Sequence, residues 1–240
     1  MNKASLQSLF LSMAILIIST VGGALIAQKL AKGNAGFSFL WCGCTIATLI
    51  LLSQLLMFQN AKKKLFFQLL YFGFFGFSMT WFMLSLSFPI FWTSEISITG
   101  KSILALTFLV IMILNFNLGW QILNKKWIET DKHFFSTGSH TLWTGDDWNR
   151  MIKSMKITHN IFIPGISEKW VPVLSILLIL FMIAGLNLRN VYPMFSVFAW
   201  GVPATVMASY FIQVSGSYFA QAAQVRAIEK NLQYNIKSTS

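Results

Sequence analysis

Long apolar stretches separated by short polar ones dominate the chain. Six of them run over residues 5–28, 37–58, 65–91, 102–123, 171–188 and 191–212. Each is long enough, or nearly so, to cross a hydrocarbon core of about 30 Å as a helix. The pattern therefore predicts an all-α polytopic membrane protein with six transmembrane helices, grouped as four and then two.

The polar stretches between these spans divide the chain into four units. We expect a four-helix transmembrane unit over residues 1–123 and a polar segment over 124–170. A two-helix transmembrane hairpin over 171–213 and a C-terminal helix and tail over 214–240 complete the chain. Within the sixth span, Gly201 and Pro203 predict a kink, because proline removes a backbone donor and its ring crowds the preceding turn.

The first apolar stretch has two interpretations. Lys3 precedes it and Ala27 could end a cleavage site, as in a secretory signal peptide. However, residues 4–28 carry no charge, a length that suits a complete span. Ser19, Gly23 and Ala27 also form a ladder of small residues, which lets two membrane helices approach closely. We therefore expect a retained first span.

Lysine and arginine predict the orientation. If both termini are cytoplasmic, 14 of the 18 basic residues fall on the cytoplasmic side, including the run at 62–64. The opposite topology would break the positive-inside rule at every major loop. The sequence thus predicts a multi-pass protein of a bacterial inner membrane. Its net charge of +11 suits contact with anionic lipid headgroups better than nucleic-acid binding, because the basic residues flank the spans.

The spans contain few strongly polar side chains. No Asp, Glu, Lys, Arg or His lies within a span away from its ends, and active transport commonly depends on such residues. Asn115 and Asn117 lie in the fourth span, where amides usually join helices through hydrogen bonds. They point to different faces of a helix, so at least one is placed to meet another helix or another subunit.

Within the polar segment, an amphipathic helix is expected from about residue 144 to 159. Thr144 and Asp147 have the spacing of a capping box. Apolar residues recur on one face and basic residues lie mostly away from it. The apolar set is Trp148, Met151, Ile152 and Met155, and the basic set is Arg150, Lys153 and Lys156. Two roles remain open: a helix in the membrane interface that docks partners, or a helix packed on other cytoplasmic segments.

No pattern in the chain predicts a catalytic centre, a metal site or a cofactor. Asp131, His133 and His140 could approach one another, but they lack the spacing of a known zinc motif. Cys42 and Cys44 point to different sides of a helix, so packing explains them better than redox chemistry. Helix capping explains the adjacent Asp146 and Asp147.

These observations favour a non-enzymatic inner-membrane component of a larger assembly. Secretion, conjugation and defence or exclusion systems are the settings considered. Its cytoplasmic loop would dock protein partners, and the chain could also form a homo-oligomer. The first alternative is a small-solute transporter or channel. The second is a membrane enzyme acting at the lipid interface, with His133, His140 and Asp147 as its candidate residues.

Overall fold

Every regular element in the described part of the chain is a helix. The computed structural model describes residues 3–31, 33–61, 64–134, 144–163 and 167–237. The α-helices are α1 (Lys3–Leu30), α2 (Ala35–Ala61), α3 (Leu65–Ser87), α4 (Ile98–Phe134), α5 (Gly145–Ser154), α6 (Val171–Leu188) and α7 (Pro193–Leu232). Short 3₁₀ helices, η1 (Phe88–Trp92) and η3 (Glu168–Trp170), follow α3 and precede α6.

Five helices among the described residues are long and apolar enough to cross a membrane, namely α1, α2, α3 with η1, α4 and α7. This is the composition and length of a multi-pass membrane protein. The expected fifth span is α6, which has 18 residues and is the shortest of the six. At 1.5 Å per residue it measures about 27 Å, slightly less than a typical hydrocarbon core.

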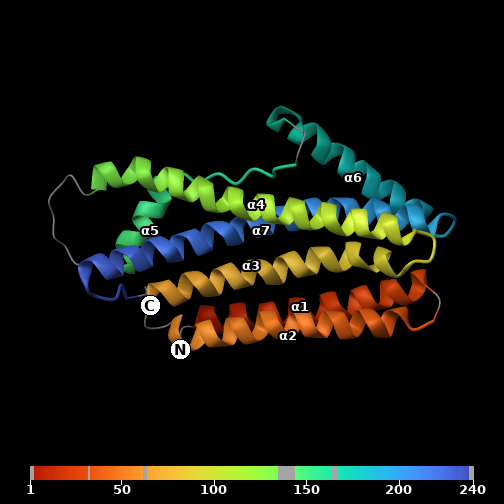
Figure 1. Cartoon of the computed structure of the whole chain (residues 1–240), viewed down its shortest axis with the longest axis horizontal. Coiled ribbons are helices and arrows are strands. Elements are labelled where there is room, and N and C mark those ends of the chain that lie inside the picture. Colours follow the sequence, from red (N-terminus) through yellow and green to blue (C-terminus); the bar gives the residue numbers. More distant parts are fainter. Residues whose placement is uncertain (1–2, 32, 62–63, 135–143, 164–166, 238–240) are drawn as a thin grey trace.

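The long helices run along one axis, with α3 and α7 side by side at the centre (Figure 1). α1 and α2 form a hairpin that packs on α3, whereas α4 packs mainly against α7. α7 is the one long helix with which α6 makes extensive contacts in the described part of the chain. Both termini lie at the same end of the molecule, together with α5 and the final turns of α4 and α7 (Figure 1). We call this end the N/C end.

Glycine brings the backbones of α4 and α7 into contact. A Cβ atom at Gly119 would collide with the carbonyl oxygen of Gln213, and one at Gly216 would collide with that of Phe116. The Ser217 hydroxyl, next to this crossing, donates to the Gly119 carbonyl at 3.0 Å. Such close approach increases van der Waals contact, which drives helix association where lipid removes most of the hydrophobic force.

A buried polar network joins α1, α2 and α3. Ser12 Oγ donates to Gln54 Oε1 at 2.7 Å, and Gln54 Nε2 donates to Ser78 Oγ at 2.9 Å. The two hydroxyls lie 2.8 Å apart, and all three side chains are fully buried. Each polar group therefore finds a partner inside the bundle, as burial requires.

The ladder of small residues on α1 lies against α2 and α3. Ser19 and Ala27 are buried, and a Cβ at Gly23 would run into the ring of Phe39 on α2. The same position lies 3.0 Å from the Ser85 carbonyl oxygen on α3. The ladder thus lies inside this chain, facing α2 and α3.

Several helix ends differ from the sequence-based expectation. α3 ends at Ser87 rather than residue 91, because a 3₁₀ helix that starts at Phe88 and contains Pro89 in its first turn follows it. α4 continues beyond residue 123 to Phe134, and α7 continues without a break into the expected C-terminal helix. Helix α5 ends at Ser154, before the expected end at 159, and Lys156 beyond it has a φ of 45°.

α7 passes through Pro203 as one continuous helix. Near it, Ser87 Oγ of α3 donates to the Gly201 carbonyl at 2.7 Å and lies 2.9 Å from Thr205 Oγ1. Thr205 Oγ1 also bonds the Gly201 carbonyl, at 2.9 Å. These hydroxyls add donors to the Gly201 carbonyl, whereas the carbonyl that loses its helical donor at Pro203 is that of Ala199, four residues before it. The kink at Pro203 stays a prediction.

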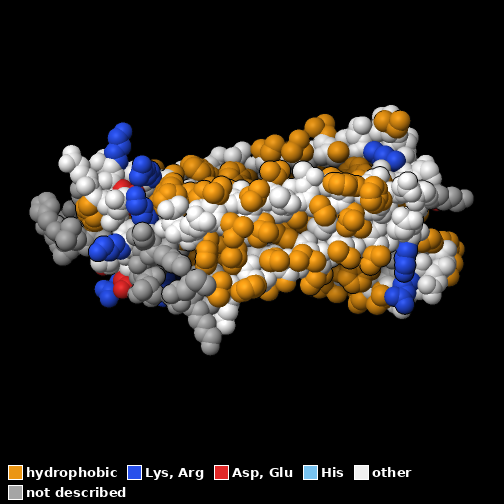
Figure 2. Space-filling view, turned by 90° about the horizontal axis from the view of Figure 1, so that it is seen from below, with side chains coloured by type: hydrophobic (Ala, Val, Ile, Leu, Met, Phe, Trp, Pro, Cys, Tyr) orange, Lys and Arg blue, Asp and Glu red, His pale blue; other side chains and the backbone are white. Residues whose placement is uncertain are grey.

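The surface of the bundle has the character of a lipid-facing one. On the face in Figure 2, lysine and arginine gather at the two ends, and apolar side chains cover much of the wide band between them. Large apolar residues such as Phe10, Leu25 and Trp41 are more than 60% exposed. A water-facing surface would not tolerate so much contiguous apolar area.

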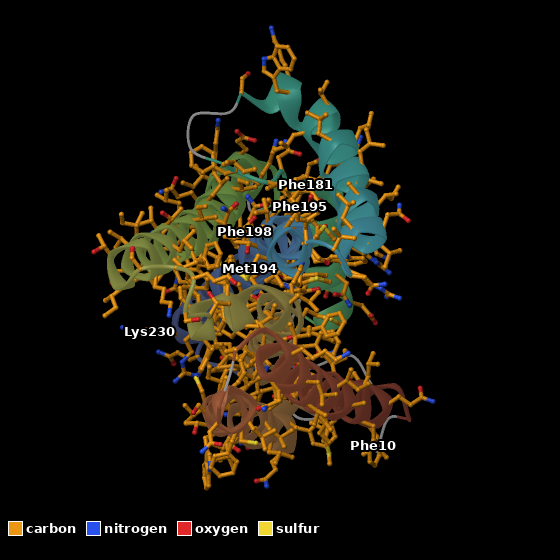
Figure 3. The ribbon with its side chains drawn as sticks, turned by 90° about the vertical axis from the view of Figure 1, so that its right-hand side faces the viewer. Phe10, Phe181, Met194, Phe195, Phe198 and Lys230 are labelled. Atoms are coloured by element: carbon orange, nitrogen blue, oxygen red, sulfur yellow. The ribbon has the colours of Figure 1, made fainter. Side chains whose placement is uncertain are left out.

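α6 leans on the first turns of α7. Phe181 of α6 meets Phe195 of α7 edge to face, with ring centroids 5.2 Å apart (Figure 3). A Cβ added to Gly185 would collide with the Cβ of Ala199, so small residues set this crossing as well. Most other side chains of α6 are exposed, which leaves it the least covered of the apolar helices.

Candidate functional site

The first candidate region is helix α5 at the N/C end. Thr144 caps this helix: its Oγ1 accepts from the Asp147 N–H at 3.3 Å, and Asp147 Oδ2 accepts from the Thr144 N–H at 2.9 Å. Asp147 Oδ2 also accepts from the Thr144 hydroxyl at 2.7 Å. The hydroxyl bond and then the backbone bond stabilise the carboxylate, so the pKa of Asp147 is lowered. The capping box fixes where α5 begins.

The apolar face of α5 is covered by the protein itself. Trp148, Met151 and Met155 are at most 4% exposed, and Ile152 packs partly buried beside them. The Trp148 ring lies 5.2 Å from that of Trp127 on α4. The sequence left open whether this face lies in the membrane interface or packs on other parts of the protein, and in this arrangement it packs on α4 and α7. The basic side chains Arg150, Lys153 and Lys156 are exposed.

After α5 the chain turns at Lys156 and then runs between α4 and α7, without regular secondary structure, to residue 163. Asn115 of α4 makes a two-way bond with its backbone: Asn115 Nδ2 donates to the Phe162 carbonyl at 2.8 Å, and the Phe162 N–H donates to Asn115 Oδ1 at 3.0 Å. Gln213 of α7 donates to the Asn160 carbonyl at 2.8 Å. These amides therefore hold non-helical backbone, a role that sequence reasoning did not assign to them.

Such bonds would be needed if α4 crosses a membrane, as its length and composition suit. Asn115 stands ten residues before Lys125 on α4, about 15 Å along the helix axis. Non-helical backbone at membrane depth is tolerated only where protein or a water-filled cavity satisfies it. We refer to this stretch as the braced segment.

His159 of the braced segment lies against α7. Its Nε2 is 2.8 Å from Ser217 Oγ. Because the single hydroxyl hydrogen of Ser217 points to the Gly119 carbonyl, its oxygen is free to accept from an Nε2–H.

A pocket of about 330 Å³ lies between α5, the start of the braced segment and α7. Its polar lining comprises Lys153, Lys156, His159, Ser217, Tyr218 and Gln221. The sequence contained one signal for it: Gln213, Ser217 and Gln221 repeat every four residues along an apolar helix, which puts three polar groups on one face.

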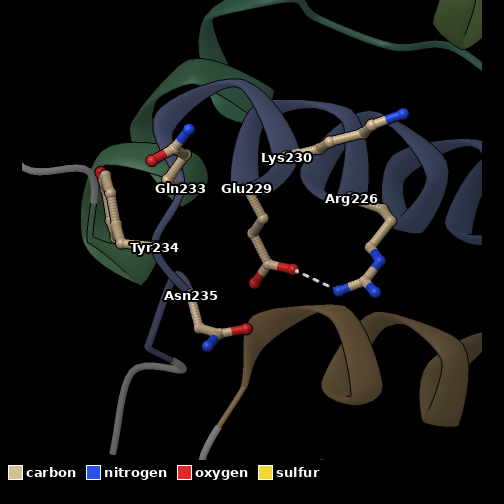
Figure 4. Close-up of a pocket in the computed structure, with 6 residues that line it drawn as sticks. All are labelled: Arg226, Glu229, Lys230, Gln233, Tyr234 and Asn235. Atoms are coloured by element: carbon tan, nitrogen blue, oxygen red, sulfur yellow. Dashed lines mark hydrogen bonds and ion pairs between the residues drawn. The ribbon is translucent and has the colours of Figure 1, made fainter.

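A second pocket, of about 400 Å³, lies at the C-terminal end of α7 (Figure 4). Glu229 is its buried acid, and its Oε2 lies 3.5 Å from Arg226 Nη1. Its Oε1 accepts from the Ile236 N–H at 3.0 Å, so the carboxylate holds the chain where it folds back after Gln233. The Ile236 carbonyl in turn accepts from the Leu65 N–H at 3.0 Å. Glu229 thus closes the N/C end, which is a structural task.

The remaining candidate residues lie apart from these pockets. Asn117 is exposed on α4, on a different side from the buried Asn115. Cys42 and Cys44 are free and exposed on α2. Among the described residues, no three His, Cys, Asp or Glu side chains are close enough to hold a metal ion. The side chains of Asp131 and His133, and the whole of His140, lie outside the description.

Comparison with known proteins gives no relative for this chain: no protein-family model matches it, and neither a curated protein nor a solved structure is significantly similar. The class of protein therefore follows from its own features. It is an all-helical protein with several helices suited to crossing a membrane.

Proposed function

We propose that the protein is a non-enzymatic, multi-pass component of a larger assembly in a bacterial inner membrane. α6 would complete six spans, and both termini would lie in the cytoplasm. The distribution of basic residues supports this orientation, because it favours the N/C end as the cytoplasmic one. Secretion, conjugation and defence or exclusion systems are the settings that such a component would fit.

The observation that carries the proposal is an exposed polar side chain on a helix suited to crossing a membrane. Asn117 lies within the α4 span, about 12 Å along the axis from Lys125, and is exposed. It makes no hydrogen bond with the described residues. One helical turn further on, Gln121 is also exposed. An amide without a partner in hydrocarbon costs several kcal/mol, about 4–8 on scales that allow no hydrogen bond.

The surroundings of Asn117 favour a second helix as its partner. Exposed residues with three- and four-residue spacing lead up to it along α4, the spacing of a coiled-coil seam. These residues are Ile103, Leu106, Val110 and Ile113. A carboxamide both donates and accepts, so the same face of a second copy could satisfy it. A different membrane protein with a hydrogen-bonding side chain is the alternative partner.

A photo-crosslinking residue at position 113, inside living membranes, tests the proposal. We expect a discrete adduct, either at twice the 27.2 kDa of the chain or with another protein, that weakens when Asn117 is replaced by leucine. The control is the same probe at Ile17, which is 52% exposed on α1. Labelling of lipid alone at both positions, together with a monomer in mild detergent, would exclude the proposed assembly.

Docking on the cytoplasmic side would use the exposed side of α5. The apolar face of this helix is already covered, so Asp146, Asn149 and Arg150 are the residues open to a partner. Charge reversal at Arg150 should reduce copurification of a cytoplasmic partner without affecting the α4 crosslink. The two contacts can therefore be lost separately.

Asn117 also supports a second function, a small-solute channel. In a ring of subunits the exposed amides of α4 could line a pore in place of a helix contact. Flux through reconstituted liposomes that falls with Asn117→Ala would favour this reading. Absence of flux for small ions and metabolites would leave the assembly role.

A further inference from the structure

The pocket between α5 and α7 combines positive charge with buried polar groups. Lys153 is on the last turn of α5, and Lys156 follows it in a left-handed conformation with a φ of 45°. Both side chains are exposed and line the pocket. The lining contains no acidic residue among those described, and neither lysine has an ion-pair partner there. Among the described residues, nothing therefore compensates the positive charge at this site.

Gln221 supplies an independent observation. It lies on the α7 wall of the pocket, is only 7% exposed, and makes no hydrogen bond with the described residues. The amide is not sealed inside the protein, because its atoms reach the pocket that Gln221 lines. An accessible amide beside two lysines suits a ligand with oxygen acceptors, because the amide nitrogen and the ammonium groups donate to the same kind of atom.

The depth of the pocket places it near the lipid headgroups. α4 and α7 run in the same direction: Gly119 meets Ser217, and Gln224 Nε2 donates to Asn124 Oδ1 at 3.0 Å. Gln221 lies between these two contacts, so the pocket is within about two turns of Lys125. Lysines at the end of a span lie in the headgroup region.

The remaining lining suits a molecule with an apolar part. Ile152, Ile157 and Val214 contribute apolar side chains to the same pocket. A volume of about 330 Å³ exceeds that of a phosphate ion and leaves room for the glycerol region of a lipid. The site therefore has a cationic part, a hydrogen-bonding wall and an apolar wall.

We propose that this pocket binds a phosphate or phosphodiester group, with Lys153 and Lys156 neutralising its charge and Gln221 donating to its oxygens. A lipid headgroup and free phosphate share this chemistry. Neither the α4 contact nor the docking side of α5 takes part, so the site is independent of the function proposed above.

Titration of the full-length protein in mild detergent tests the site. Phosphatidylglycerol is the probe, phosphatidylcholine is the neutral lipid and inorganic phosphate is the soluble anion. Native mass spectrometry counts bound lipid, and the thermal midpoint reports the apparent affinity. We expect phosphatidylglycerol to bind and phosphatidylcholine to bind far more weakly. Competition by phosphate would show that the phosphate group alone suffices, and lack of competition would assign the site to the lipid.

The variants separate this pocket from general attraction to charge. Replacing Lys153 and Lys156 by glutamine should weaken binding roughly tenfold or more, since each interfacial lysine contributes about fivefold. The matched control replaces Lys125 and Lys237, which are exposed at the same end but do not line the pocket. Equal effects of the two double variants, or equal binding of the two lipids, would overturn the proposal.

Gln221→Leu separates a binding role from a structural one. The free protein should be about as stable as the original, because the amide that is removed bonds none of the described residues. Its response to phosphatidylglycerol should nevertheless fall severalfold. Loss of stability with an unchanged lipid response would mean that Gln221 serves packing, and would also overturn the proposal.

Discussion

The braced segment allows a sharp test of how this protein holds non-helical backbone between two long helices. Asn115→Leu keeps a side chain of similar size but removes the amide that bonds both backbone groups of Phe162. Leucine suits both a helix and lipid, so α4 itself should tolerate the change. The effect should appear in residues 156–163, far from the substitution in sequence.

The magnitude follows from the two bonds that are lost. Each buried backbone group without a partner costs about 1–3 kcal/mol, so the two together cost about 2–6 kcal/mol if the segment stays in place. Phe162 is 40% exposed, so the segment can move out from between α4 and α7, where its backbone groups can find other hydrogen-bond partners. We therefore expect the lower half of that range, with local opening as the main result.

Hydrogen exchange of the purified protein in lipid nanodiscs measures this opening. Amides between residues 157 and 163 should exchange about 30-fold faster or more in Asn115→Leu, the factor that corresponds to about 2 kcal/mol. Asn117→Leu is the matched control, because that amide bonds none of the described residues. If the segment exchanges at the original rate in Asn115→Leu, or if both variants behave alike, the bracing role of Asn115 is refuted.

Two further substitutions test the helix crossing and the helix cap. Gly119→Ala should reduce the folding free energy by about 1–3 kcal/mol and lower the thermal midpoint, because the new Cβ meets the Gln213 carbonyl. The control is Gly22→Ala, whose Cβ meets nothing within 4 Å and which should leave the midpoint unchanged. Equal midpoints of the two variants would contradict the close crossing of α4 and α7. Asp147→Asn should destabilise α5 by up to about 1 kcal/mol, because the amide can still accept from Thr144 but lacks the negative charge that strengthens these bonds at the helix N-terminus. Because folding lowers the pKa of Asp147 from its ordinary 3.8, its contribution is complete above that pH and is lost as the pH falls through the folded pKa. Hydrogen exchange of α5 between pH 6 and 3 should therefore depend less on pH in Asp147→Asn than in the original, and identical pH profiles would count against the cap.

Much of the secondary structure could be predicted from local pattern. The apolar stretches predicted α1, α2, α3, α4 and α7, because a helix in lipid must be apolar along a sufficient length and must satisfy its own backbone. The helix ends were harder to predict: α4 and α7 continue well past the apolar spans expected to end at residues 123 and 212, and the two helices pack on each other. Helix ends that depend on tertiary contacts are not encoded in hydrophobicity.

The candidate sites depended on contacts between distant residues. Asn115 and Asn117 look alike in the sequence, yet one holds the braced segment and the other faces outward. The amphipathic pattern of α5 fits a lipid surface or a protein surface equally well, since either buries the same face. Only the position of Trp127 and the end of α7 shows which surface covers Trp148.

The sequence by itself determined that this is a helical membrane protein with basic residues concentrated beside certain spans. Hydrophobicity and charge act residue by residue against lipid and water, so a single chain suffices to read them. The tertiary structure decided which amides hold non-helical backbone, which glycines allow helices to touch and where Lys153, Lys156 and Gln221 meet. Those properties arise between residues far apart in the chain, because a hydrogen bond or a close packing contact exists only once both partners are in place.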